Sequence, residues 1–241
     1  MRVKDGVPTF DNGCLTPEGG AGILTDGTMK DGMPALLTGE APGRPPDAWP
    51  VGYAKRLPAG AKLLLQIHYS KNGSVERDRS KVGLIFAKEP PQKEIFTEAI
   101  RNHYFLIPPG ADNHEVKACY TFPEDVQILS LMPHMHLRGK DMEFKAISPN
   151  GGSEILLRVP NYSFSWQTTY YLRKPLAIAK GTRFEVNAHF DNSPKNKDNP
   201  DPSKTVRWGD PTYDEMMIGW VDYARDVQKP PATAGPGGAA K

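Results

Sequence analysis

The sequence has few cysteines, no long apolar run and no excess of one charge. Its 241 residues include only Cys14 and Cys119, which excludes a disulfide scaffold but allows a single bridge. No apolar run reaches the roughly 18 residues that a membrane-spanning helix needs. The 30 Lys and Arg nearly balance the 28 Asp and Glu, and no basic cluster indicates a nucleic-acid surface. We therefore expect neither a membrane span nor a nucleic-acid partner.

Glycine and proline are abundant, with 23 Gly and 24 Pro in the chain. That density interrupts helices and is typical of many short strands joined by turns. Apolar and polar residues alternate, or form short apolar runs, and predict strands at 63–70, 82–87, 104–110, 115–122, 127–139, 142–148, 154–159, 168–178, 184–190 and 215–224. Pro133 within one of these strands implies an edge or a bulge. The predicted fold class is all-β, of the sandwich type.

The chain divides into three predicted segments. The first, 1–94, begins with Gly/Pro-rich extended loops over about 50 residues and ends in the polar stretch EPPQKE. The second, 95–226, holds most of the predicted strands and forms a β-sandwich domain. The last, 227–241, is rich in Pro, Gly and Ala and is predicted to be a disordered tail.

The most informative motif is His134-Met135-His136, with the Asp214-Glu215-Met216 string well downstream. Alternate side chains of a strand share a face, so the two imidazoles are expected to point the same way. Two imidazoles and one thioether make a soft, nitrogen-rich site that suits copper, and the sulfur favours Cu(I). Met217 competes with Met216, because successive strand residues face opposite ways.

Structural interpretations exist for each of these residues. A His-X-His pair on a strand is commonly a surface or hydrogen-bonded pair, and a methionine is more commonly core than ligand. His68 lies on the more polar face of its predicted strand, as an isolated histidine. His103, His114 and His189 have no spacing signal and are interpreted as structural or exposed. The Asp/Asn-rich stretch 191–201 lacks the spacing of a calcium loop and is interpreted as a solvated loop.

The order of several motifs resembles that of the copper type II, ascorbate-dependent monooxygenases, which include the peptidylglycine α-hydroxylating and dopamine β-monooxygenases. The motifs are LLLQIHYS, IPPG, LMPHMHLRGKDM and the Asp214-Glu215-Met216 string. The resemblance runs from about residue 45 to residue 225, and the strings LMPHMHLRG and VRWGDPTYDEMM look most like the bacterial members. Any one motif alone is weak, and their order makes the resemblance specific.

The resemblance implies two β-sandwich domains of the jelly-roll type, each with a copper ion facing a solvent-filled cleft. His134, His136 and Met216 would form the catalytic, oxygen-activating copper site. His68 would be the third histidine of the electron-transfer copper. The segment 1–94 would be the C-terminal part of the first domain, which is only partly present, and 95–226 would be the second.

The sequence departs from the family pattern in two ways. It has no adjacent His-His pair, which the electron-transfer copper of the family requires, so the second copper site is incomplete. Where the peptide-hydroxylating members bind a substrate carboxylate through Arg, Asn and Tyr, the matching residues here are Met132, Ile218 and Trp220. A role in peptide amidation is therefore not predicted. Cys119 falls where the family often has a disulfide cysteine, and Cys14 is its only possible partner.

Two functions follow from the resemblance. The first is O₂-dependent hydroxylation of a small-molecule substrate at the copper site, if an upstream part supplies the second copper site. Its electrons would come from ascorbate, a cytochrome, an upstream redox domain or a partner chain. The alternative is a non-catalytic copper-binding or structural β-sandwich module within a larger complex. Family members work outside the cytoplasm, which implies a periplasmic or secreted protein whose export signal lies outside this chain, because MRVKDGVPTF has no apolar segment.

Overall fold

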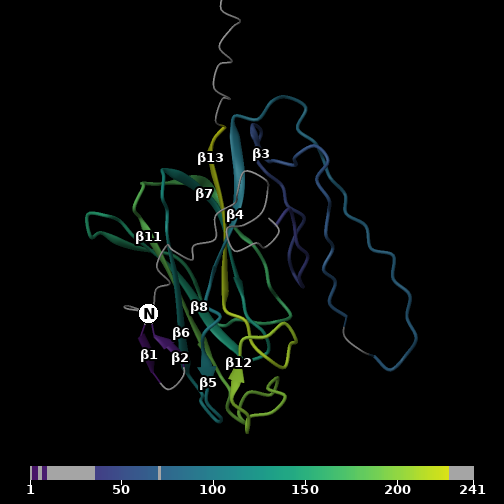
Figure 1. Cartoon of the computed structure of the whole chain (residues 1–241), viewed down its shortest axis with the longest axis vertical. Helices are drawn as coiled ribbons and strands as arrows, with labels where there is room; N and C mark the ends of the chain where they lie inside the picture. Colours follow the sequence, from purple (N-terminus) through teal and green to yellow (C-terminus); the bar gives the residue numbers. More distant parts are fainter. Residues whose placement is uncertain (1, 5–6, 10–35, 70–71, 228–241) are drawn as a thin grey trace, which may run out of the picture.

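All regular structure in the described part of the chain is β-strand (Figure 1). The computed structural model describes residues 2–4, 7–9, 36–69 and 72–227. Within these residues no helix is long and apolar enough to span a membrane. The prediction of an all-β fold class is therefore confirmed.

Thirteen strands are formed by the described residues, and nine of them build two larger sheets. The nine are β3 (Tyr53–Lys55), β4 (Lys93–Arg101), β6 (His114–Thr121), β7 (Val126–His134), β8 (Gly139–Ile147), β9 (Ser153–Val159), β10 (Tyr170–Ile178), β11 (Arg183–Phe190) and β13 (Ile218–Asp226). One sheet has the order β10-β7-β13-β4-β3 and the other the order β6-β11-β8-β9. Two small pairs complete the set: β1 (Arg2–Lys4) with β2 (Val7–Thr9), and β5 (Leu106–Ile107) with β12 (Val206–Arg207).

The main core lies between the two larger sheets. Phe144 and Phe184 of the four-stranded sheet and Ile128 and Val221 of the five-stranded sheet are fully buried in one apolar cluster. Along β11 every second residue is buried, as expected for a strand with one face on the core. Two sheets sharing one apolar layer form a β-sandwich, as predicted.

A register shift in β7 decides which of its residues face the main core. Ile128, Leu131 and Met135 lie in the main core, whereas Leu129 packs on the opposite side of the sheet. Pairing with β13 shifts register at this point, and a bulge reverses the face on which the following residues lie. Pro133 lies beyond Leu131, where the pairing of β10 ends, so its missing N–H interrupts no ladder on that side.

Residues 36–55 cover part of the outer face of the five-stranded sheet. Trp49 and Tyr53 pack against a small cluster formed by Ile95, Leu129 and Ala224. This segment lies in the region predicted to be extended loop, and only the three residues of β3 join the sheet. Earlier in the same region β1 and β2 form a strand pair that the composition did not predict.

The buried ammonium of Lys55 attaches this segment to the sheet. Lys55 Nζ donates to Thr97 Oγ1 at 2.8 Å and lies 3.8 Å from Asp222 Oδ1. Thr97 and Ser130 each donate a hydroxyl hydrogen bond to the Asp222 carboxylate. Burial lowers the pKa of Lys55, and the Asp222 carboxylate opposes that shift. A buried charge is retained here because an opposite charge and hydroxyl groups surround it.

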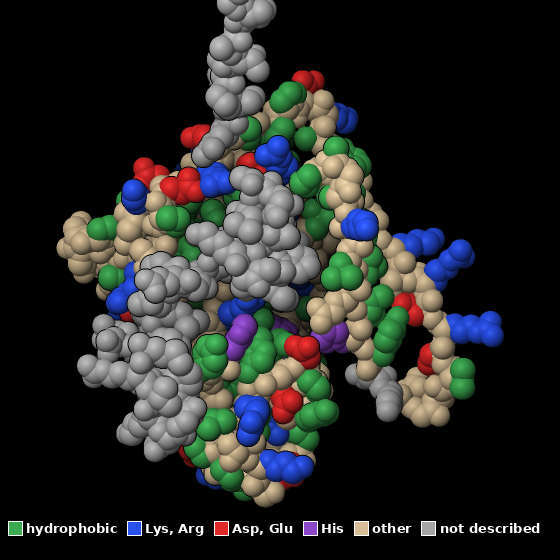
Figure 2. All heavy atoms as spheres, viewed as in Figure 1, with side chains coloured by type: hydrophobic (Ala, Val, Ile, Leu, Met, Phe, Trp, Pro, Cys, Tyr) green, Lys and Arg blue, Asp and Glu red, His purple; other side chains and the backbone are tan. Residues whose placement is uncertain are grey.

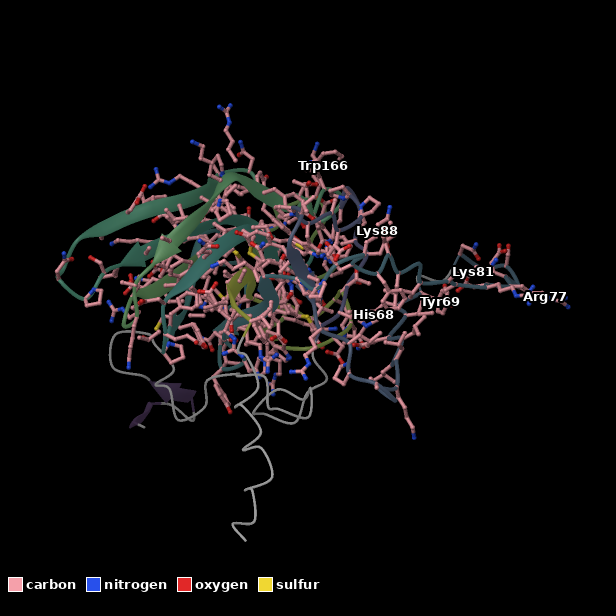
Figure 3. All side chains as sticks on the ribbon, turned by 90° about the horizontal axis from the view of Figure 1, so that it is seen from above. His68, Tyr69, Arg77, Lys81, Lys88 and Trp166 are labelled. Atoms are coloured by element: carbon pink, nitrogen blue, oxygen red, sulfur yellow. The ribbon has the colours of Figure 1, made fainter. Side chains whose placement is uncertain are left out.

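Two predicted strands, 63–70 and 82–87, are not strands in the structure. Residues 63–69 and 82–87 have no strand partner in the described part of the chain, and Leu64 and Ile85 are exposed by 78% and 102%. Figure 3 shows this segment extending from the sheets, with Arg77 far from them. Alternation shows that a segment can bury one face, but a strand forms only where another strand accepts its backbone hydrogen bonds.

Candidate metal site

The two histidines of the HMH motif lie where β7 ends. His134 is the last residue of β7, and His136 lies in the turn that leads to β8. Their ring centroids are 5.4 Å apart, with the rings nearly perpendicular. Histidine side chains gather near the middle of the face in Figure 2, among hydrophobic and acidic groups. The predicted pair of imidazoles on one side of the chain is therefore present, although only the first is in a strand.

Met135 holds the motif in this orientation. Its side chain is fully buried in the main core, so the rings on either side of it turn away from the core. The hydroxyl of Tyr162 accepts a hydrogen bond from Met135 N at 3.1 Å and donates one to Met135 O at 2.6 Å. The peptide between the two histidines is thus fixed by packing on one side and by two hydrogen bonds on the other.

Each imidazole is oriented through its Nδ1 atom. His134 Nδ1 donates to Gln167 Oε1 at 2.7 Å, and Gln167 Nε2 donates to Phe164 O, which fixes the orientation of the amide. His136 Nδ1 donates to Asp214 O at 3.2 Å. A carbonyl oxygen can only accept, so both Nδ1 atoms carry the proton and both Nε2 atoms keep a lone pair. This tautomer is the one required of two Nε2 metal ligands.

Both histidines are neutral at physiological pH. Burial lowers the pKa of His134 to about 4, and the hydrogen bond that His134 donates to Gln167 opposes the shift. Burial likewise lowers the pKa of His136, and the hydrogen bond to Asp214 opposes the shift. A neutral imidazole is the form that binds a metal ion, so no proton has to be displaced on binding at neutral pH.

The Asp214-Glu215-Met216 string is hydrogen-bonded to the histidine motif, although it lies far downstream in the sequence. Glu215 accepts backbone hydrogen bonds from His136 N at 2.8 Å and from Arg138 N at 2.6 Å. Met216 follows it and is half-buried, whereas Met217 is fully buried in the main core. Of the two candidate thioethers, only that of Met216 has an exposed part and a neighbour bound directly to His136.

A buried polar framework surrounds this connection. Arg138 is 1% exposed, and its guanidinium donates to Asn192 Oδ1 and to Tyr213 O, both at 2.9 Å. Burial raises the pKa of Glu215 to about 8, and the two backbone donors and Arg138 act in the opposite direction. Arg138 and Glu215 therefore tie the β7–β8 turn to the loops 191–204 and 208–216.

The remaining histidines differ in their relation to this pair. His68 lies on the exposed segment 63–69 and interacts electrostatically with both His134 and His136. His103 stacks on Trp208, His189 is 2.7 Å from Asp141, and His114 is half-buried on β6. Of the four, His68 is the one with an electrostatic interaction with both rings of the motif.

The donor set fits copper. Over residues 36–69 and 72–227 no three His, Cys, Asp or Glu side chains come together to hold a metal ion. The thioether of Met216 remains the third ligand expected from the sequence. Two neutral imidazoles and one thioether are ligands that bind Cu(I) well and suit neither magnesium nor calcium.

Several residues of this site were not predicted from the sequence. Gln167, Tyr162, Arg138 and Glu215 orient the ligands, yet none belongs to the HMH motif. Three of them lie in loops or turns whose contacts cross 27 to 79 positions of sequence. In the sequence, the only signal for a role of Glu215 and Arg138 was their position, next to Met216 and two residues after His136.

The chain belongs to the copper type II, ascorbate-dependent monooxygenase family. The model of the C-terminal domain of that family matches residues 98–232, more than half of the chain. The match includes both histidines of the motif and Met216, and it confirms the resemblance given by the motif order. Copper and ascorbate dependence are properties of this family.

Other comparisons add no argument about function. No curated protein sequence matches the chain. Among solved structures, the VP2 subviral particle of infectious bursal disease virus is similar with a TM-score of 0.27 and 10% identity, over 61% of this chain and 37% of that one. A structure of the Gx strain of the same virus has a TM-score of 0.26 and 13% identity, over 61% and 36%. The chain thus spans little more than a third of the length of these structures.

The cysteine bridge stays a prediction. Cys119 is buried on β6 and is not a free thiol. Cys14 lies outside the described residues.

Replacing Gln167 tests whether it orients His134. Gln167→Leu removes the acceptor of the Nδ1 proton, and we expect copper affinity to fall by about 10- to 100-fold, as for other partners behind a metal ligand. Gln127, which bonds Tyr53 on the outer face, supplies the matched control Gln127→Leu. Competition with a Cu(I) chelator measures both, and equal affinities would contradict the assigned role.

Proposed function

We propose that this chain contributes the oxygen-activating site of a copper-dependent monooxygenase, which hydroxylates a small-molecule substrate with O₂. One observation supports it above all others: two adjacent imidazoles each have Nδ1 hydrogen-bonded to a carbonyl oxygen, and Glu215, the chain neighbour of Met216, is bound to the backbone of His136. His134, His136 and Met216 are the proposed metal ligands and catalytic residues.

The residues around the ligands have defined tasks in this proposal. A copper ion held there supplies one-electron redox chemistry with O₂, and its thioether ligand stabilises the reduced state. Gln167 and the Asp214 carbonyl keep the Nδ1 protons in place, so each Nε2 lone pair stays available. Tyr162 and Glu215 hold the backbone on either side of His136. Such fixed orientation lowers the reorganisation that catalysis requires.

Hydroxylation needs electrons that one metal site cannot supply. Conversion of C–H and O₂ to C–OH and water consumes two electrons and two protons. Ascorbate is the proposed donor, and a cytochrome, an upstream redox domain or a partner chain is the alternative. His68 is proposed as one ligand of the electron-transfer copper, because the resemblance to the family implies that role and His68 interacts electrostatically with both His134 and His136. The remaining ligands of that site would come from outside this chain.

The surroundings of His134 favour an uncharged, apolar part of a substrate. Ile218 pairs directly with His134, and Trp220 pairs with Met132, so these side chains share the outer face of the sheet. Phe164 lies with its ring centroid 6.0 Å from that of His136. No charged side chain occupies the three positions where peptide-hydroxylating members bind a carboxylate. A small apolar or aromatic molecule fits these neighbours better than a peptide carboxylate does.

The wider setting of the chain is also part of the proposal. Residues 95–226 form the copper-binding domain with a jelly-roll topology, 1–94 belong to the end of a preceding domain, and 227–241 form a tail. We place the protein in the periplasm or outside the cell, where a Cys14–Cys119 bridge would be stable. The family match over residues 98–232 supports the assignment of the copper-binding domain.

A non-catalytic module in a larger complex is the second candidate. The exposed apolar side chains of the segment 56–92 favour it, among them Leu64, Ile85 and Phe86. A contiguous exposed apolar surface marks a site of association with another protein surface. In the first candidate a copper ion at the site takes part in hydroxylation, and in the second it catalyses no reaction.

Isotopically labelled O₂ separates the two candidates. Copper-loaded protein, ascorbate and a panel of small aromatic and aliphatic compounds are incubated with the labelled gas. A monooxygenase places one labelled oxygen in the product in a ratio of about one to each O₂ consumed. Ascorbate oxidation without any labelled product, at wild-type copper content, would favour the non-catalytic module.

Met216 is tested by its preference for one oxidation state. Met216→Ile removes the sulfur but keeps an apolar side chain, and we expect Cu(I) affinity to fall more than Cu(II) affinity, because the thioether is a soft ligand. Met217→Leu is the control, since that core side chain tolerates a volume-conserving change at a cost below about 1.5 kcal/mol. An equal fall in Cu(I) and Cu(II) affinity in Met216→Ile would indicate that Met216 packs against its neighbours and does not bind the metal.

A further inference from the structure

The N-terminal segment contacts the loop that orients His134. Residues Ala41–Arg44 form a tight turn, closed by a hydrogen bond from Arg44 N to Ala41 O at 2.9 Å. Pro42 occupies the second position and Gly43 the third, with φ of +84° at Gly43. This is the arrangement of a type II turn, which requires a residue that tolerates positive φ at the third position.

The turn is bound to residues 166 and 167. Pro42 O accepts a hydrogen bond from Gln167 N at 2.6 Å. Gly43 lies against the indole of Trp166 so closely that an added Cβ would be 2.8 Å from Cε3 of that ring. Gln167 itself is 2% exposed, and its side chain binds His134 Nδ1. The chain of contacts therefore runs from the turn through one residue to the imidazole.

The turn is held in place independently of the metal site. Arg44 donates to Gly39 O at 2.7 Å and to Asp47 Oδ1 at 2.8 Å, and the Arg44–Asp47 side chains are 8% and 11% exposed. Farther along, Lys55 attaches the same segment to the five-stranded sheet. The turn is therefore stabilised locally by Arg44 and attached to the sheet through Lys55, so it can hold Gln167 in place.

We propose that the Ala41–Arg44 turn positions the metal ligand His134 by holding Gln167, with Pro42 and Gly43 as positioning residues. The proposal rests on the proposed function in so far as His134 is a copper ligand. A positioning role explains why residue 43 is a glycine. A side chain there would meet the ring of Trp166, and the turn must present the carbonyl of Pro42 to Gln167. Residues about 90 positions before the histidine motif thus belong to its supporting structure.

Gly43→Ala tests the proposal, with Gly73→Ala as the matched control. Both glycines have φ of +84°, so both variants carry the same backbone strain. Only at Gly43 does the new methyl group meet another residue, because no atom lies within 4 Å of the corresponding position at Gly73. A difference between the two variants therefore reports the contact with Trp166 rather than the strain.

The first readout uses metal-free protein. We expect the nitrogen-bound ring proton of His134 to be protected from exchange and visible by NMR in the wild type and in Gly73→Ala, and to be lost or broadened in Gly43→Ala. The second readout is the Cu(II) dissociation constant, which we expect to rise about 10-fold in Gly43→Ala alone. Gly43→Asn, which tolerates positive φ, replaces the alanine variant if that variant does not fold.

An unchanged His134 ring proton in a folded Gly43 variant would overturn the proposal. So would an equal loss in both glycine variants, because strain alone would then account for it. If the wild type binds no copper, the proposed function fails, yet the metal-free readout still decides whether the turn positions the ring. The two failures are therefore distinguishable.

Discussion

The His136→Ala variant is expected to lose tight copper binding. The change removes one of the two imidazoles, and loss of a direct ligand should exceed the roughly 10- to 100-fold effect of losing a partner behind it. Affinity for Cu(I) should therefore fall by more than about 100-fold. Competition with a chelator of known affinity measures it, and hydroxylation should fall with it.

His114→Ala is the matched control for this variant. His114 is also a partly buried histidine on a strand, but it lies on β6 of the other sheet. Its replacement should leave copper affinity unchanged. Thermal unfolding of both variants checks that the fold is kept, because His136 is only 4% exposed. Equal copper affinity in the two variants would refute the assignment of the ligands.

Glu215→Ala is expected to have the largest effect on stability. Its carboxylate accepts the N–H groups of His136 and Arg138 in a buried setting, and each orphaned donor would cost about 1–3 kcal/mol. We expect the free energy of unfolding to fall by about 2–6 kcal/mol, because two buried donors are orphaned at about 1–3 kcal/mol each.

Glu143→Ala provides the comparison in urea unfolding. Glu143 accepts from Arg158 on the surface, where the Arg158 side chain is 61% exposed. Exposed pairs contribute little, so this variant should lose no more than about 1 kcal/mol. Copper affinity should fall in Glu215→Ala and not in Glu143→Ala, because Glu215 joins the His136 backbone to Met216. Similar unfolding energies for the two variants would contradict the buried role of Glu215.

Strands with one buried face were well predicted from the sequence. The predicted ranges 115–122 and 184–190 differ by a residue from β6 and β11, because alternation directly reflects the one-sided burial of these strands. β4 was missed, since most of its residues are buried on both faces and no alternation results. Residues 63–69 and 82–87 alternate but have no strand partner, and the sequence of a strand does not reveal its neighbour.

The candidate ligands were likewise easier to predict than their supports. His134 and His136 were found because i and i+2 spacing brings two imidazoles together on any extended chain. Gln167, Glu215 and the turn at Ala41–Arg44 reach them across long stretches of sequence, through a backbone carbonyl, a carboxylate and an amide that occur in many surface loops. Only the folded chain brings these common groups to one place.

Copper content and ligand type in the reduced protein test the central claim most directly. The chain is loaded with copper, dialysed and reduced with ascorbate, and X-ray absorption is recorded on the wild type and on Met216→Ile. The account predicts about one copper per chain, with two imidazole nitrogens and one sulfur in the wild type and no sulfur in the variant. No retained copper, or sulfur ligation that persists in Met216→Ile, would contradict it.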